Sequence, residues 1–221
     1  KAEAGRCNTA QTDSVTVGAS TTHDFTLPQQ TDSFGYFCKV EAPNYIEGDT
    51  PLGLSGDDSF TSVSLPFSFS LYGTSYSTGY VCTNGYVSFT SGTCFFSNSG
   101  IPSTGDPNGA IYPYWDDLYL VNSGFGIFTS ISGNAPNRIF NIEWRAQYFP
   151  GSGSANFELR LYEGQSRFDV IYGQVDNGNT SATAGVQKND TTFTQYFCNG
   201  TGGGATGGQS YTQGPCASPT P

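Results

Sequence analysis

The 221-residue sequence has no methionine, a single histidine and only eight lysine and arginine residues. Tight nucleic-acid binding depends on basic side chains that neutralise phosphates, and so few basic residues cannot form the required patch. The same shortage argues against binding to an anionic membrane surface. The sequence also lacks the stretch of about 18 apolar residues that a membrane-spanning helix needs. We therefore expect neither nucleic acid nor an inserted membrane segment among the interactions of this protein.

Charged residues and strong helix formers are scarce as well. Charged side chains make up 12% of the chain and give a formal net charge of −10, which indicates mutual repulsion but says little about the fold. Threonine, valine, phenylalanine and tyrosine abound, so we expect strands rather than long helices. Aromatic residues make up 15% of the chain, enough to bury a core, which argues against disorder. The 29 glycines and 12 prolines exceed average usage only moderately.

Six cysteines indicate an oxidising compartment. An even number of cysteines in an acidic chain, without CxxC clusters or histidine partners, favours disulfides over a metal site. Cys82 and Cys94 flank one predicted hairpin and are expected to pair. For the other four cysteines two arrangements are open, and we favour the first: Cys38–Cys198 with Cys7–Cys216, or Cys7–Cys38 with Cys198–Cys216.

The sequence begins at Lys1 without a methionine. We expect that a signal peptide has been removed and that the mature protein is extracellular or lies at the cell surface. Residues 1–44 contain β-prone pieces and are predicted to form an arm, possible strand donors being Ser14–Val17 and His23–Leu27. Residues 45–198 are predicted to form the β-sandwich. Residues 199–221 are predicted to form a glycine-rich tail that leads into a Pro/Thr linker.

Alternating apolar and polar residues predict many short strands. In the stretch that begins at Phe60, every second residue from Val63 to Leu71 is apolar, which is the pattern of a strand with one buried face. Pro66 removes one hydrogen-bond donor from this strand and favours an edge position or a bulge. Asn84-Gly85 lies between two β-prone stretches and predicts a hairpin turn. Such strands lead us to expect an all-β fold, an antiparallel two-sheet β-sandwich with disulfides and extended tails.

Two later stretches, 138–148 and 155–162, carry polar residues on one face. If the two strands pair antiparallel, Glu143 can meet Arg160 and Arg145 can meet Glu158. Each such pair would contribute a few tenths of a kcal/mol. The arginines would also lower the pKa values of the two glutamates.

Several short motifs follow one another in a characteristic order: Leu65–Phe69, Leu71–Gly73, Thr83–Phe89, Ala110–Leu118, Glu143–Arg145, Phe157–Leu159 and Leu161–Gly164. In this order they resemble the nidogen-like (NIDO-type) extracellular module, and more closely the bacterial secreted β-modules that are appended to subtilases and surface proteins. The resemblance covers roughly residues 33–198. It implies a β-sandwich with an adhesive or accessory role and no established active site. The Cys82 and Cys94 pair and the long ends depart from the pattern.

Residues suited to catalysis are few. His23, the one histidine, would have to serve any Ser-His-Asp triad, yet it lies in a segment that we expect to be peripheral, so a structural role is favoured. A glycosidase needs two carboxylates about 5–10 Å apart, one of them with a raised pKa. The carboxylates available by type are Asp116, Asp117, Glu143, Glu158 and Glu163. Because arginines are predicted opposite Glu143 and Glu158, we expect no enzymatic activity and no cofactor.

Binding residues can also be named by type. Asp57-Asp58 and Asp116-Asp117 could offer oxygen ligands to Ca²⁺, but without DxDxDG spacing we favour turn and cap hydrogen bonds and expect no metal. Tyr112, Tyr114 and Trp115 are candidates to face a ligand such as a glycan, although core packing competes with this role. Three asparagines fit the N-x-[ST] glycosylation pattern: Asn179, Asn189 and Asn199.

Two functions compete on these grounds. We favour a non-enzymatic structural or adhesive protein, a subunit of a surface filament or homopolymer that assembles through its terminal arm and sheet edges. The alternative is a glycan- or surface-binding accessory module of a larger secreted enzyme.

Overall fold

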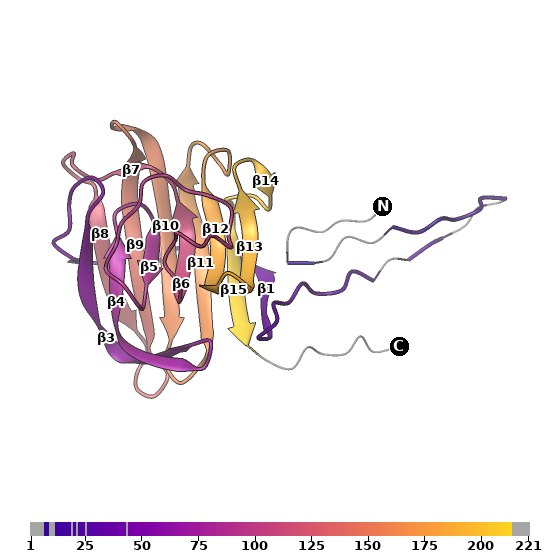
Figure 1. Ribbon diagram of the computed structural model, residues 1–221, viewed down its shortest axis with the longest axis horizontal. Helices are drawn as coiled ribbons and strands as arrows, with labels where there is room; N and C mark the ends of the chain where they lie inside the picture. The colour runs from indigo at the N-terminus through magenta and orange to yellow at the C-terminus, as the bar shows by residue number, and fades with distance from the viewer. Residues whose placement is uncertain are drawn as a thin grey trace.

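The computed structural model describes residues 7–8, 12–18, 20, 22–24, 26–42 and 44–213. These residues form two antiparallel sheets and contain no helix, which confirms the predicted all-β sandwich (Figure 1). One sheet has the order β1 (Tyr36–Glu41), β15 (Gly208–Gln213), β11 (Arg167–Val175), β10 (Ser152–Tyr162), β9 (Ile139–Tyr148), β8 (Gly126–Ser132) and β2 (Thr50–Pro51), with β7 (Leu118–Tyr119) paired to β9. The other has the order β14 (Thr201–Gly202), β13 (Thr192–Cys198), β12 (Thr183–Asn189), β6 (Ala110–Trp115), β5 (Tyr86–Ser88), β4 (Thr74–Cys82) and β3 (Phe60–Leu71).

Strand β3 shows how the alternating sequence builds the core. The apolar residues at alternate positions from Val63 to Leu71 are buried, the serines between them are exposed or half-buried, and Phe60 at the start of the strand is exposed. As predicted from Pro66, β3 is the last strand of its sheet, and its register with β4 is interrupted between Ser64 and Phe69. Between the sheets, the ring of Trp144 stacks on Phe157 at a centroid distance of 5.0 Å.

The two polar strands pair in a register different from the predicted one. Glu143 lies opposite Glu158, and the arginines lie opposite Asn141 and Asn156. Each arginine instead turns back to the glutamate two residues earlier on its own strand, because residues i and i+2 share one face. The ion-pair distances are 2.8 Å for Arg145–Glu143 and 2.6 Å for Arg160–Glu158. The predicted cross-strand pairs are therefore wrong.

A segment that we call the strap, residues 44–48, covers these ion pairs. It lies in the connection from β1, at one edge of the eight-stranded sheet, to β2 at the opposite edge. Gly48 N donates to Glu143 Oε2 at 2.6 Å, Tyr45 OH donates to Glu143 Oε1 at 2.9 Å, and Ile46 N donates to Glu158. The side chains of the sheet also donate to strap carbonyls: Asn141 to Ile46, Arg145 to Gly48 and Arg160 to Asn44.

Burial under the strap changes the expected electrostatics. Glu143 is 2% exposed and Glu158 is 0% exposed. Loss of solvent raises the pKa of Glu158 to about 7, even though Arg160 and the Ile46 amide act in the opposite direction. The predicted lowering of this pKa is wrong because desolvation of the carboxylate outweighs its ion pair.

The ends of the sandwich also differ from the prediction. Strand β1 pairs with β15, and β15 pairs with β11, so residues 36–41 and 208–213 are part of the eight-stranded sheet. The sandwich therefore extends beyond the predicted limits of 45 and 198. Gly203, which precedes β15, is needed for packing: a Cβ atom at this position would come within 2.3 Å of the Tyr196 ring.

The disulfides confirm one prediction and correct another. Cys82 pairs with Cys94, as the hairpin predicted. Cys7 pairs with Cys38 rather than with Cys216, so the favoured arrangement is wrong, and the two ends of the sandwich are joined by strand pairing instead. Cys198 has no disulfide partner among the described residues, and Cys216 lies outside them.

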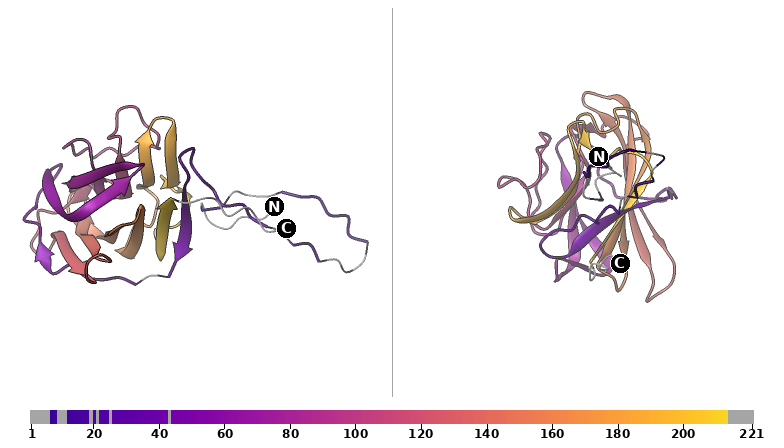
Figure 2. Two further views of the ribbon diagram at one scale, coloured as in Figure 1. Left: turned by 90° about the horizontal axis from the view of Figure 1, so that it is seen from below. Right: turned by 90° about the vertical axis from the view of Figure 1, so that its right-hand side faces the viewer.

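The described part of the N-terminal arm projects away from the sandwich beside β1 (Figures 1 and 2). Residues 12–17 are exposed and form no strand, and Val17 is 76% exposed. The base of the arm is attached by the Cys7–Cys38 disulfide and by a bridge between Thr31 and Phe37. The arm is therefore a protruding loop rather than a layer of the core.

Candidate functional site

The Asn84-Gly85 turn, the Asp57-Asp58 pair and the Asp116-Asp117 pair meet at one end of the sandwich, around the side chain of Asn84. This residue is fully buried in the turn between β4 and β5. Its Nδ2 donates to Asp58 Oδ1 at 2.8 Å, and its Oδ1 accepts from the Leu118 amide at 2.9 Å. The Asp116 amide donates to the Asn84 carbonyl at 3.3 Å. The hairpin turn thus holds the two acidic segments side by side.

Three carboxylates converge at this junction, and we call them the acidic cluster: Asp57, Asp58 and Asp117. One oxygen of each lies within 4.8 Å of the others. Burial raises the pKa values of Asp57 and Asp117, and the neighbouring carboxylates add to the effect. Oδ1 of Asp57 is buried and has no hydrogen-bond partner in the described part of the chain. Carboxylate oxygens in this arrangement are the group that could hold a hard divalent cation.

The fourth aspartate of the two motifs has a structural role. Asp116 is 6% exposed, and its carboxylate accepts from Ser181 Oγ at 2.6 Å and from the Asp117 amide at 2.9 Å. Burial raises its pKa, and these hydrogen bonds act in the opposite direction. The predicted turn and cap hydrogen bonds therefore describe Asp116, and also Asp58 through its bond with Asn84.

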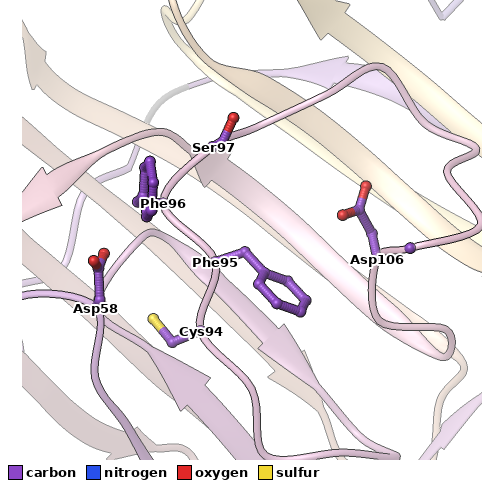
Figure 3. A pocket seen from close by; sticks show the side chains of 7 residues that line it. Asp58, Cys94, Phe95, Phe96, Ser97 and Asp106 are labelled. Atoms are coloured by element: carbon purple, nitrogen blue, oxygen red, sulfur yellow. The ribbon is translucent and has the colours of Figure 1, made fainter.

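A pocket of about 380 Å³ lies beside the acidic cluster and shares Asp58 with it (Figure 3). Its lining comprises Asp58, Cys94, Phe95, Phe96, Ser97, Gly105 and Asp106. Phe95 is 41% exposed and Phe96 is 54% exposed, although both are large apolar side chains. Asp58 and Asp106 lie on opposite sides of the two rings. We call this feature the phenylalanine pocket.

Buried neighbours fix the loop that carries these phenylalanines. Tyr86 OH donates to the Thr93 carbonyl at 3.0 Å and accepts from the Phe95 amide at 2.9 Å. Trp115 Nε1 donates to the Phe95 carbonyl at 2.8 Å, and the Cys82–Cys94 disulfide attaches the loop to β4. The two rings are therefore exposed on a backbone that is held in place.

The aromatic residues proposed to face a ligand do not do so. Tyr112, Tyr114 and Trp115 are each 0% exposed. The Tyr112 hydroxyl donates to the Pro107 carbonyl at 2.7 Å, and the Tyr114 hydroxyl to the Gly178 carbonyl at 2.7 Å. They pack the core and support loops. The exposed aromatic residues were missed, and their signal is a Phe-Phe pair directly after a disulfide cysteine.

Other candidate residues lie apart from this junction. His23 Nε2 lies 3.0 Å from Asp13 Oδ2 in the arm. Among the predicted glycosylation residues, Asn199 is exposed, whereas Asn179 and Asn189 are half-buried. Asn179 Nδ2 donates to the Gly203 carbonyl at 2.7 Å. Glycosylation of these asparagines stays a prediction.

The two packed antiparallel sheets and the two disulfides define the protein as a disulfide-bonded β-sandwich module. A family model described as NIDO related matches residues 35–213. The chain therefore belongs to the NIDO-related family, which confirms the resemblance in the motifs. No curated protein and no solved structure matches the chain.

Family membership and two disulfides are consistent with an extracellular location. In the part of the chain that the structure describes, no helix is long and apolar enough to cross a membrane.

Proposed function

We propose that this protein is a structural or adhesive extracellular module that self-associates, through its N-terminal arm and its sheet edges, into a filament or polymer. The observation that carries this proposal is the exposed arm. Residues 12–17 are extended, include the β-prone Ser14–Val17 stretch, and pair with no strand among the described residues. Val15 and Val17 are 40% and 76% exposed, an arrangement that a partner strand would cover.

Strand β3 supports the proposal as an acceptor edge. It is the longest strand at a sheet edge, and in the described structure its outer side has no ladder partner. Pro66 limits pairing in its second half, whereas Phe60–Ser64 contains no proline. An unpaired edge of this kind is a template for an added strand. At the other sheet, the edge strand β1 is already partly covered by Thr31 and Gln29 of the same chain.

Light scattering and electron microscopy test this proposal. We expect the mass of the wild-type protein to rise with concentration, and negative-stain images to show filaments. The Val17→Asp variant places a charge in the arm, and the Ser64→Lys variant places one at the edge of β3. Because a charge disfavours strand addition, each should lower the polymer mass at least tenfold. Val121→Asp is the matched control, since Val121 is 52% exposed and lies in a loop outside the arm.

A wild-type protein that stays monomeric at every concentration would contradict the proposal. The same would follow if Val121→Asp abolished assembly as completely as Val17→Asp. Thermal unfolding of each variant checks that the sandwich itself remains folded.

We propose further that the module works without catalysis. Glu143 and Glu158 lie opposite each other and are the carboxylates that most resemble a glycosidase pair. Each of them is paired with an arginine and covered by the strap. The alternative function, a surface-binding accessory module, gains support only from the phenylalanine pocket.

A further inference from the structure

The phenylalanine pocket is not used by self-association through the arm and β3. Two carboxylates and two exposed phenylalanine rings line it, and no basic residue does. Hydrogen bonds between Phe95 and the buried side chains of Tyr86 and Trp115, together with the Cys82–Cys94 disulfide, hold in place the backbone of the loop that carries the phenylalanines. A pocket of this construction needs little rearrangement to bind a ligand, because its walls are already in place.

Hydrogen bonds hold both carboxylates in position. Asp58 accepts from the buried Asn84 side chain at 2.8 Å, and Asp106 accepts from Ser99 Oγ at 2.8 Å. Neither carboxylate has an ion-pair partner among the described residues. The pocket is therefore a site of negative charge with aromatic walls (Figure 3).

The chemistry of the lining selects the ligand. Its side chains offer carboxylate acceptors, and the Ser97 hydroxyl is the one conventional hydrogen-bond donor among them. A neutral sugar can donate its hydroxyls to these carboxylates, but it leaves both negative charges uncompensated, so a cation is the better match. A cation with an apolar stem fits well, because the head can reach a carboxylate while the stem and the charge lie against phenylalanine rings.

We propose that the phenylalanine pocket binds a basic side chain, lysine or arginine, of a partner polypeptide. The net charge of −10 favours the approach of such a partner. The exposed ring of Phe96 extends the contact beyond the pocket, onto the partner surface next to the basic residue. None of the lining residues belongs to the arm or to β3, although Asp58 lies two residues before the start of β3, so the proposal does not depend on self-association.

An NMR titration of the ¹⁵N-labelled protein tests this site with single-residue probes. The cationic probes are Nα-acetyl-lysine methylamide and Nα-acetyl-arginine methylamide. The neutral probes are Nα-acetyl-norleucine methylamide, which keeps the apolar stem, and N-acetylglucosamine. We expect a saturable shift of the amides of residues 94–97 with a cationic probe, and at least tenfold weaker binding of both neutral probes. Binding should weaken at least fivefold in 0.5 M NaCl.

Variants assign the effect to the pocket. Asp58→Asn and Asp106→Asn keep an oxygen that can accept the existing hydrogen bonds, yet each should weaken the cationic probe at least fivefold. Phe96→Ala should also weaken binding of the cationic probe. Because the Phe96 side chain is half-exposed, its removal should leave the stability of the fold nearly unchanged. Asp190→Asn is the matched control, because Asp190 is an exposed carboxylate in the turn between β12 and β13.

Three results would overturn the proposal. The first is the absence of a saturable shift with either cationic probe. The second is equal binding of the norleucine probe or tighter binding of N-acetylglucosamine. The third is a loss of binding in Asp190→Asn as large as the loss in Asp58→Asn. None of these results bears on assembly, which is measured without a probe.

Discussion

At the scale of single residues, the turn at Asn84 and Gly85 has two roles, and the sequence predicts only one of them. The Asn-Gly pair predicts a hairpin, and Gly85 does have a positive φ of 82°. The structure adds a close approach: a Cβ atom on Gly85 would lie 1.9 Å from the Tyr114 carbonyl oxygen. Contacts of this kind join strands distant in sequence, so local pattern cannot reveal them.

The acidic cluster yields a prediction for Asp117→Asn. Removing one of three neighbouring like charges should stabilise the fold at pH 7 by about 0.5 kcal/mol, which corresponds to a Tm increase of roughly 1–2 °C. Because the pKa values of Asp57 and Asp117 are raised in the folded state, the repulsion grows as pH rises through these values. The gain should therefore disappear below about pH 3.8, where the carboxylates are protonated in both states.

Calorimetry of Asp117→Asn, with Asp190→Asn as the control, measures this difference. A lower Tm for Asp117→Asn at pH 7 would contradict the prediction. It would show that the carboxylate is needed, and addition of EDTA to the wild-type protein would then show whether a bound cation is the reason.

At the scale of elements, the strap converts the outer face of the eight-stranded sheet into a buried polar layer. The alternation in β9 and β10 correctly predicted that the glutamates and arginines share a face opposite the core. It could not predict that a segment from another part of the chain covers that face. The predicted pKa of Glu158 was consequently wrong, since it depends on burial under the strap, whereas the error in register concerns the pairing of β9 with β10 alone.

The strap makes the stability depend on pH through Glu158. Its pKa is raised from 4.5 to about 7 by burial, so the folded state binds this proton more tightly than the unfolded state. The resulting stabilisation is complete below pH 4.5 and is lost as pH rises through 7. The upper bound of the loss is about 3 kcal/mol. Glutamine cannot ionise, so Glu158→Gln should show a flatter dependence of Tm on pH between 5 and 8.

Glu163 provides a control of opposite sign for this experiment. Its hydrogen bonds with Arg138 lower its pKa to about 2, so its contribution is present above pH 4.5 and is lost as pH falls towards 2. Glu163→Gln should leave the slope between pH 5 and 8 unchanged. Parallel Tm curves for the wild type and Glu158→Gln across that range would show that Glu158 does not titrate there.

At the scale of the whole molecule, the sequence predicted the fold class, the family and one disulfide, but not where the sandwich ends. Composition marked residues 199–221 as a tail because glycine is frequent there. The partner of β15 on one side is β1, more than 160 residues earlier in the chain. Pairing over such a distance leaves little trace in local composition.

The Cys7–Cys38 bond gives a prediction for the response to force. Tension applied at the N-terminus passes from Cys7 directly to Cys38, so the intervening arm bears none of it. In optical tweezers, reduction of this bond should add about 100 Å of extension before the sandwich opens, since the two cysteines are 31 residues apart. An unchanged extension after reduction would contradict this force path.

The pairing of β1 with β15 then determines how the module yields. With the Cys7–Cys38 bond intact, tension enters β1 at Cys38, which lies opposite Tyr211, close to the end at which the chain leaves β15. Pulling the two ends apart loads the hydrogen bonds one after another, as in opening a zip, whereas anchors at Glu41 and Gln213 would load them all at once. A polymer that transmits load through the chain ends would therefore open first at this strand pair. One that transmits load through β3 would leave the pair unstressed, and the same sandwich would be soft in one direction and stiff in another.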